Sequence, residues 1–260
     1  MKKFTLITGA SMGIGKALAA ECASRGMNLF LVSLPGDGLE SFRRELEKKY
    51  DIVTEYLCID LSKESSASVV YEYAQSHHLQ VDTLINNAGI GHAGDFHQMD
   101  PAEIREMIDL NLRALTTLSL LFIRNMIHNK RGHILNVGSL GAYTPVAYKS
   151  VYLATKSYVF FFTSALKEEY KNAPLKFSVL MPGGVATNNM VKERVKDAGL
   201  LSRMSVLSPE YVARYTLDKM EKGKFTIMPG VVSKSIFSVS KILPNGVLLY
   251  IMKKVFGNHK

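Results

Sequence analysis

A glycine-rich turn joins the first apolar run of the chain to its first helix-forming run, and it constrains the fold more than any other feature. Residues 4–8 are apolar or β-branched, and residues 16–23 are good helix formers. Between them lie Gly9, Gly13 and Gly15. The first glycine allows a tight turn, the second a close approach of pyrophosphate to the backbone, and the third close packing of helix on strand. A helix N-terminus there would present unpaired N–H groups to phosphate, so the turn predicts a dinucleotide-binding βα unit.

Five further short apolar runs follow, separated by helix-length segments. Most are nearly continuous in apolar or β-branched residues, which is typical of strands covered on both faces. No repeat or Pro/Gly/Ser linker divides the chain. The sequence therefore predicts one α/β domain of Rossmann type, a doubly wound parallel sheet with helices on both faces. The expected strands are Phe4–Thr8, Asn28–Leu34, Thr54–Ile59, Thr83–Asn86, His133–Gly138 and Lys176–Met181.

The positive charge is concentrated near the C-terminus. The net charge of the chain is +9, yet residues 222–260 contain seven Lys and no acid. The preceding residues show no basic stripe, so nucleic-acid binding is not expected. We divide the chain into a dinucleotide-binding domain, 1–221, and a basic extension, 222–260. Within the extension, residues 247–256 are apolar with a basic end, which fits peripheral contact with an anionic membrane, a cover over a substrate pocket or contact with a second subunit.

Targeting and metal-binding signals are weak. The first apolar run is too short for a signal peptide, and no apolar run reaches the ~20 residues that span a bilayer, so a cytoplasmic protein is expected. Cys22 and Cys58 lack C-x-x-C spacing and are expected to be buried free thiols. The histidines near loops have no ligand spacing, so no metal site is expected; they are His77, His78, His92 and His97.

Further motifs follow the glycine turn in a fixed order. Asn86-Asn87-Ala88-Gly89 follows the fourth expected strand, and Asn111 lies in a helical segment after it. Ser139 ends the fifth strand, and Tyr152-x-x-x-Lys156 begins 13 residues later. Pro182-Gly183-Gly184-Val185-Ala186-Thr187 follows the sixth. Together with the glycine turn, residues 4 to about 190 resemble the classical short-chain dehydrogenases/reductases.

The resemblance implies an NAD(P)-dependent oxidoreductase that acts on CH–OH donors or the matching carbonyls. It implies four catalytic residues, Asn111, Ser139, Tyr152 and Lys156. The cofactor-binding residues that it implies are Gly9, Ser11, Met12, Gly13, Ile14, Gly15, Ser33, Asp60, Leu61, Asn87, Ala88, Gly89, Tyr152, Lys156, Pro182, Gly183, Val185 and Thr187.

Tyr152 and Lys156 are four residues apart and therefore share one face of a helix. We expect the ammonium to lower the pKa of the phenol. Tyr152 would protonate a carbonyl oxygen as hydride arrives from the nicotinamide, and Ser139 would hydrogen-bond the same oxygen. By resemblance, Lys156 also holds the nicotinamide ribose, and Asn111 positions a water of a proton relay.

The end of the second strand bears on cofactor choice. Relatives that use NAD commonly have an acid there, whereas NADP enzymes often have a base at that position or the next. This chain has Ser33 and Leu34. A serine does not repel a 2′-phosphate, so we favour NADP; Asp37, if a shifted loop brings it to the ribose, favours NAD.

The segment of about 188–209 is expected to form the substrate loop, and its apolar residues suit a hydrophobic ketone or alcohol, as do Ile90, Ala142, Tyr143 and Val146. The leading interpretation is an NADPH-dependent carbonyl reductase. Alternatives are an NAD-linked alcohol dehydrogenase, a 3-ketoacyl thioester reductase and a non-enzymatic dinucleotide-binding scaffold. Residues 160–162 are more apolar than a solvent-facing helix requires, and the resemblance implies a homodimer or homotetramer formed through this helix and the one that carries Asn111.

Overall fold

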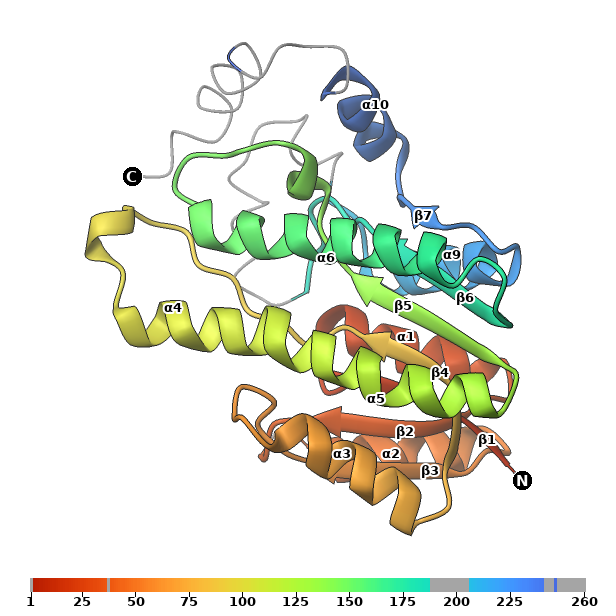
Figure 1. Cartoon of the computed structure of the whole chain (residues 1–260). Helices are drawn as coiled ribbons and strands as arrows, with labels where there is room; N and C mark the ends of the chain where they lie inside the picture. Colours follow the sequence, from red (N-terminus) through yellow and green to blue (C-terminus); the bar gives the residue numbers. More distant parts are fainter. Residues whose placement is uncertain (1, 37, 188–205, 241–245, 247–260) are drawn as a thin grey trace.

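The computed structural model describes residues 2–36, 38–187, 206–240 and 246. Their central element is a seven-stranded parallel sheet in the order β3-β2-β1-β4-β5-β6-β7 (Figure 1). The chain builds β1 to β3 outward in one direction, and then continues on the other side of β1 from β4 to β7. The strands are β1 Lys3–Thr8, β2 Asn28–Ser33, β3 Thr54–Cys58, β4 Gln80–Asn86, β5 Gly132–Val137, β6 Leu175–Leu180 and β7 Thr226–Ile227.

The six strands that the sequence predicts are confirmed. Five of them agree with the structure to within one residue at each end, and β4 begins three residues earlier, at Gln80. The seventh strand, β7, was missed because two residues are too few to show a periodic pattern. β7 pairs with β6 through Val179–Thr226 and Leu180–Ile227, so this part of the basic extension completes the sheet.

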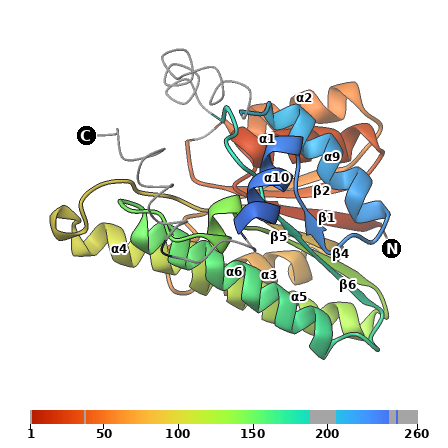
Figure 2. The same cartoon turned by 90° about the horizontal axis from the view of Figure 1, so that it is seen from above.

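Helices cover both faces of the sheet (Figure 2). One face carries α1 (Gly13–Ser24), α2 (Leu39–Lys49) and α9 (Pro209–Glu221), whose buried side chains share a core cluster with β1, β2, β5 and β6. The other face carries α3 (Ser66–Ser76), α5 (Leu115–His128) and α6 (Ser150–Glu169). α4 (Pro101–Ile108) continues through a π-helical turn (Asp109–Ala114) into α5, and α10 (Val231–Ser240) packs on a short 3-10 helix (Leu140–Tyr143). The continuous apolar strands are thus buried between two helical layers.

A buried polar chain ties the middle of the sheet to the helices over it. Asn86 Nδ2 on β4 donates to Asn136 Oδ1 on β5 at 2.8 Å and to Ser119 Oγ on α5 at 3.1 Å. Asn136 Nδ2 donates in turn to Thr163 Oγ1 on α6 at 2.9 Å. Because each donor is satisfied without water, the chain fixes how the two helices sit on β4 and β5.

The two cysteines differ in burial. Cys22 is fully buried, as expected, and burial raises the pKa of its thiol to about 12. Cys58 is exposed, so the expectation of a second buried thiol was wrong; it is the last residue of β3, the edge strand of the sheet. Residues 247–256 lie outside the described residues. Among the residues that are described, no helix is long and apolar enough to cross a membrane.

Candidate active site

A cleft of about 450 Å³ opens at the carboxyl ends of the central strands, where the strand order reverses beside β1. A crevice at this position is where open α/β sheets place their ligands. All the predicted site residues line it except Gly15 and Asn111. The predicted residues that the fold brings together here are Gly9, Ser11, Met12, Gly13, Ile14, Ser33, Asp60, Leu61, Asn87, Ala88, Gly89, Ser139, Tyr152, Lys156, Pro182, Gly183, Val185 and Thr187.

The glycine turn is as tight as the sequence predicts. Gly9 has φ +64°, in the left-handed region that favours glycine. A Cβ on Gly15 would lie 2.1 Å from the carbonyl oxygen of Gly9, so Gly15 packs against the turn and does not line the cleft. A Cβ on Gly13 would lie 3.1 Å from the side chain of Thr187, which brings the turn against the segment after β6.

The turn is fastened to the end of β4. The backbone N–H groups of Asn87 and Ala88 both donate to Thr8 Oγ1 at 3.0 Å. Asn87 Nδ2 donates to the carbonyl oxygens of Thr8, at 2.9 Å, and Gly9, at 3.1 Å. Asn87 thereby satisfies carbonyls at the turn that α1 does not reach, and it holds β1 and β4 side by side at the mouth of the cleft.

Asn111 is buried behind the cleft, on the π-helical turn. Its Oδ1 accepts from the N–H of Ile90 at 3.0 Å, and its Nδ2 donates to the carbonyl of Ile90 at 2.8 Å and to Thr155 Oγ1 at 3.0 Å. A Cβ on Gly89 would lie 3.0 Å from Asn111 Oδ1 and 3.3 Å from Lys156 Nζ. In this structure Asn111 therefore positions Gly89 and Ile90 beside Lys156.

Ser139, Tyr152 and Lys156 meet at the end of β5. The Ser139 hydroxyl hydrogen-bonds Tyr152, and Ser139 Oγ also accepts from the N–H of Gly141 at 3.2 Å. Lys156 Nζ donates to the carbonyl of Val137 at 3.0 Å and lies 5.8 Å from the centroid of the Tyr152 ring. The hydroxyl pair and the ammonium thus line one wall of the cleft, as donors toward a bound oxygen atom.

Burial dominates the protonation of this group. It lowers the pKa of Lys156 to about 8. It also raises the pKa of Tyr152, and the hydrogen bond from Ser139 offsets only part of that rise. The expectation that Lys156 lowers the pKa of Tyr152 was therefore wrong for this structure, because the ammonium is directed to the carbonyl of Val137 and the cost of burying a phenolate prevails.

The ends of β2 and β3 bring Ser33 and Asp60 to the cleft. Ser33 Oγ donates to Ser11 Oγ at 2.6 Å, which joins the end of β2 to the glycine turn. Asp60 Oδ1 accepts from the N–H of Ser62, at 2.9 Å, and from its hydroxyl, at 2.7 Å. Burial raises the pKa of Asp60, but these two bonds together with the ammonium of Lys63 outweigh it and hold the pKa of the carboxyl below its usual value. Asp37 lies outside the described residues.

Other residues line the cleft that sequence reasoning did not assign to the cofactor site: Leu34, Ile59, Ile90, Glu106, Leu110, Val137 and Gly138. Two of them carried a usable signal. Leu110 immediately precedes Asn111, and Glu106 lies four residues before Leu110, on the same helix face. The expected apolar substrate wall is realised in part. Ile90 lines the cleft, whereas Ala142 and Tyr143 pack in a core cluster with Val159 and Phe160 instead.

The expected substrate loop lies mostly outside the described residues, which end at Thr187 and resume at 206. Its end is anchored beside the cleft: the N–H of Leu207 donates to the carbonyl of Gly184 at 2.9 Å, and the N–H of Ala186 donates to the carbonyl of Leu207 at 3.0 Å. Among the described residues, no group of three His, Cys, Asp or Glu side chains is placed to hold a metal ion.

The residues of the cleft fit a dinucleotide. Glycines at 9, 13 and 15 keep the backbone of the turn open, and the N-terminus of α1 begins at Gly13 without a side-chain cap of its own. Free N–H groups at such a terminus attract phosphate. Ser33 and Asp60 lie at the ends of β2 and β3, and Ser139, Tyr152 and Lys156 meet at the end of β5, so the two groups lie along the same cleft.

Comparison with known proteins gives consistent results. A family profile described as short chain dehydrogenase matches residues 3–198. An uncharacterized short-chain type dehydrogenase/reductase of Sinorhizobium fredii is 34% identical over 85% of this chain and 86% of that protein. The very-long-chain 3-oxoacyl-CoA reductase of Mus musculus is 27% identical over 95% and 82%. A short-chain dehydrogenase of Sphingobium yanoikuyae in complex with NADPH superposes with a TM-score of 0.81, at 25% identity over 95% and 94%.

The burial of Lys156 predicts a gain in stability when its charge is removed. A fall of the pKa from 10.5 to about 8 means that the buried ammonium costs the folded state roughly 3 kcal/mol. Removing the ammonium also removes its hydrogen bond to Val137, which stabilises the fold by about 1 kcal/mol. We expect Lys156→Met to raise the free energy of unfolding by about 2 kcal/mol at pH 7. Above pH 8 the folded lysine is neutral while the unfolded one still binds its proton, so wild-type stability rises with pH and the gain shrinks.

The measurement is chemical denaturation without cofactor at several pH values. Lys167→Met is the matched control, because Lys167 lies on the same helix but is exposed; it should give no pH-dependent gain. A Lys156→Met protein that is less stable than wild type, or a gain that stays constant from pH 7 to 10, would contradict the interpretation.

Proposed function

Since the chain belongs to the short-chain dehydrogenase/reductase family, we propose that this oxidoreductase transfers a hydride from NADPH to a hydrophobic ketone, and in reverse from the alcohol. The observation that carries the proposal is that Ser139, Tyr152 and Lys156 line one cleft with the glycine turn. A nicotinamide at this end of the cleft and a carbonyl beside Tyr152 would bring the reacting atoms together without further rearrangement of these side chains.

The chain's own groups handle the proton. When bound, the cofactor supplies the hydride. Tyr152 gives its phenolic proton to the carbonyl oxygen, so that one O–H bond breaks as another forms, and Ser139 donates a hydrogen bond to the same oxygen. Lys156, whose Nζ lies 5.8 Å from the centroid of the Tyr152 ring, would hold the nicotinamide ribose beside it. Because burial keeps Tyr152 protonated at neutral pH, its resting state is the one that reduction requires.

Two observations support a fatty or otherwise bulky apolar substrate. The cleft has apolar side chains beyond the cofactor-binding residues, those of Ile90 and Leu110. A relative that matches most of the chain is named for the reduction of very-long-chain 3-oxoacyl-CoA. The second of these favours a 3-oxoacyl thioester as the alternative substrate to a simple ketone.

The activity is tested by following NADPH consumption with a panel of apolar ketones and 3-oxoacyl-CoA esters of increasing chain length. Replacing Tyr152 with Phe removes the proton donor and should lower kcat by about 10²–10⁴-fold while the affinity for NADPH stays within about twofold. Tyr158→Phe is the control, because that phenol is partly exposed and hydrogen-bonds Thr116 instead.

The pH profile has a definite sign. Reduction needs the protonated phenol, so its rate should fall as pH rises through the pKa of Tyr152, which burial raises above the ordinary value of a phenol, whereas the rate of oxidation should rise over the same range. Turnover by Tyr152→Phe at the wild-type rate, or no NADPH consumption with any member of the panel, would refute the proposal.

Cofactor preference is expected to depend on Ser33. This buried hydroxyl at the end of β2 joins Ser11 of the glycine turn, and an aspartate in its place would oppose the 2′-phosphate of NADPH. We expect Ser33→Asp to weaken NADPH binding more than tenfold, because the new carboxylate repels the 2′-phosphate. NADH has no 2′-phosphate, so its binding should weaken less than threefold.

Cofactor fluorescence reports both affinities, because the chain contains no Trp. Ser76→Asp, which adds the same charge at the exposed end of α3, is the control. Tighter NADH than NADPH binding by wild type would make the NAD-linked alcohol dehydrogenase the better proposal.

We further propose that the face formed by α5 and α6 is the contact of a homodimer or homotetramer. Large apolar side chains are exposed there, with Phe161 of α6 66% and Leu120 of α5 49% accessible, and Tyr158 of α6 hydrogen-bonds Thr116 of α5. Isolated exposed apolar residues are common, but a contiguous patch on two adjacent helices is typical of an interface.

Phe161→Glu places a charge at the centre of this face. Analytical ultracentrifugation should show a dimer or tetramer for wild type and a smaller species for the variant, because an unpaired buried charge is costly. Val231→Glu, at an exposed position of α10, is the control. A monomeric wild type at micromolar concentration would exclude this contact.

A further inference from the structure

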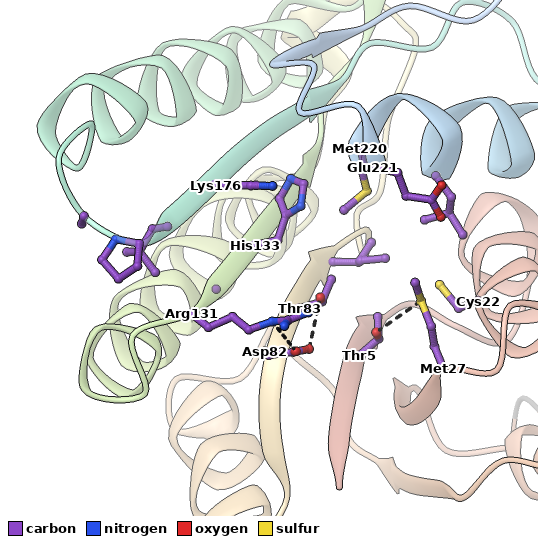
Figure 3. A pocket seen from close by; sticks show the side chains of 16 residues that line it. Thr5, Cys22, Met27, Asp82, Thr83, Arg131, His133, Lys176, Met220 and Glu221 are labelled. Carbon is purple, nitrogen blue, oxygen red and sulfur yellow. Dashed lines mark hydrogen bonds and ion pairs between the residues drawn. The ribbon is translucent and has the colours of Figure 1, made fainter.

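A second cavity, of about 560 Å³, lies at the opposite end of the sheet from the cleft (Figure 3). It is bounded by the amino-terminal parts of β1, β4, β5 and β6 and by the C-terminal ends of α1 and α9. None of its lining residues lines the cleft. Its volume is within the usual range for small-molecule sites.

One wall of this cavity holds His133, and the surrounding hydrogen bonds fix its tautomer. Ser178 Oγ donates its single proton to the carbonyl of Lys224, at 2.8 Å. The same oxygen is 2.9 Å from His133 Nε2, so the proton of that bond must come from the imidazole. The histidine is therefore the Nε2–H tautomer, and its Nδ1 carries a lone pair for which the described residues provide no donor.

The imidazole is also neutral at ordinary pH. Burial lowers the pKa of His133 to about 4, and the positive charge of Lys176 acts in the same direction. Nδ1 is consequently a hydrogen-bond acceptor and not a second N–H donor. A ligand that meets it must bring a proton of its own.

Lys176 supplies a donor beside this acceptor. His133 and Lys176 are direct neighbours in the β5–β6 register, and the Lys176 side chain points toward the imidazole (Figure 3). The other charged groups of the wall are already paired: Arg131 Nε lies 3.1 Å from Asp82 Oδ2, and Glu221 Oε1 lies 2.7 Å from Arg25 Nη1. Among the described residues, Lys176 has no such carboxylate partner.

The apolar part of the lining is adaptable, and the two threonines beside it are already bonded, Thr5 to Met27 Sδ and Thr83 to Asp82 Oδ1. Met220 on α9 and Met27, which follows α1, line the cavity (Figure 3), together with Leu217 of α9 and Ile85 of β4. Thioether side chains adjust to irregular apolar shapes better than branched ones do. The cavity therefore combines an apolar body with one neutral acceptor and one cationic donor, side by side at one wall.

A hydroxyl is the group that meets both requirements, because it donates one hydrogen bond and accepts others. A carboxylate or a ketone would satisfy the lysine but would turn its own lone pairs toward Nδ1. We propose that this cavity is a binding site for a neutral hydrophobic alcohol, whose hydroxyl donates to His133 Nδ1 and accepts from Lys176 Nζ while its apolar part lies against Met27 and Met220. The site requires neither the cofactor nor the proposed activity.

The test uses 1-octanol as the probe, with octanoate and 1-methoxyheptane as matched molecules that lack the neutral donor. ¹⁵N spectra of histidine-labelled protein should show His133 as the neutral Nε2–H form, and 1-octanol should shift its Nδ1 resonance. Methyl-labelled Met27 and Met220, assigned through Leu variants, should shift with the same saturation curve. The ether and octanoate should bind about tenfold more weakly.

Variants separate this site from the catalytic cleft. His133→Leu removes the acceptor and should weaken 1-octanol binding about tenfold, whereas His133→Gln keeps an acceptor oxygen and should recover part of it. NADPH binding, which does not use this cavity, reports whether each variant is folded. If His133→Leu does not fold, the spectra of the wild-type protein with the three probes still show whether the cavity binds the alcohol.

The proposal is overturned if 1-octanol leaves the His133 and Met27 and Met220 signals unchanged, or shifts only methionines of the catalytic cleft such as Met12. It is equally overturned if the ether or octanoate binds as tightly as the alcohol, since the hydroxyl would then have no special role.

Discussion

The joint between the end of β1 and the end of β4 supports the rest of this structure. Two N–H groups of the segment after β4 converge on Thr8 Oγ1, and Asn87 returns two hydrogen bonds to the turn after β1. At this point the strand order reverses, and the joint extends the β1–β4 ladder to the mouth of the crevice. The phosphate-binding turn and the Gly89–Ile90 segment that faces Lys156 are both fixed by it.

Asn111 transmits this geometry toward the reactive groups. Its amide clamps the backbone of Ile90 from both sides and reaches Thr155 on α6, one residue before Lys156. Glycine at 89 leaves the room in which Asn111 and the lysine approach. A buried ammonium is unfavourable for folding, which is consistent with its lowered pKa, and the surrounding contacts must offset that cost. The site thus uses stability to hold a charge close to Tyr152.

Much of the fold was predictable because its signals are local. Six strands follow from runs of apolar residues, and the glycine turn follows from spacing alone. β7 was not predictable, since two residues pair with β6 only after the sheet exists. The exposure of Cys58 was missed for a related reason, because an edge position depends on strand order and strand order is not a local property.

The sequence by itself determined the class of fold, the family and the residue types available at the site, since these depend on patterns and spacings that survive without coordinates. Tertiary structure decided what those residues experience. Burial, a property of the whole packing, sets the pKa of Tyr152 and Lys156 in directions that helix spacing does not reveal. In the second cavity, Ser178 and Lys224 come from different parts of the chain, and only their meeting with His133 fixes its tautomer. Electrostatic environment is a sum over neighbours, and only the folded chain specifies the neighbours.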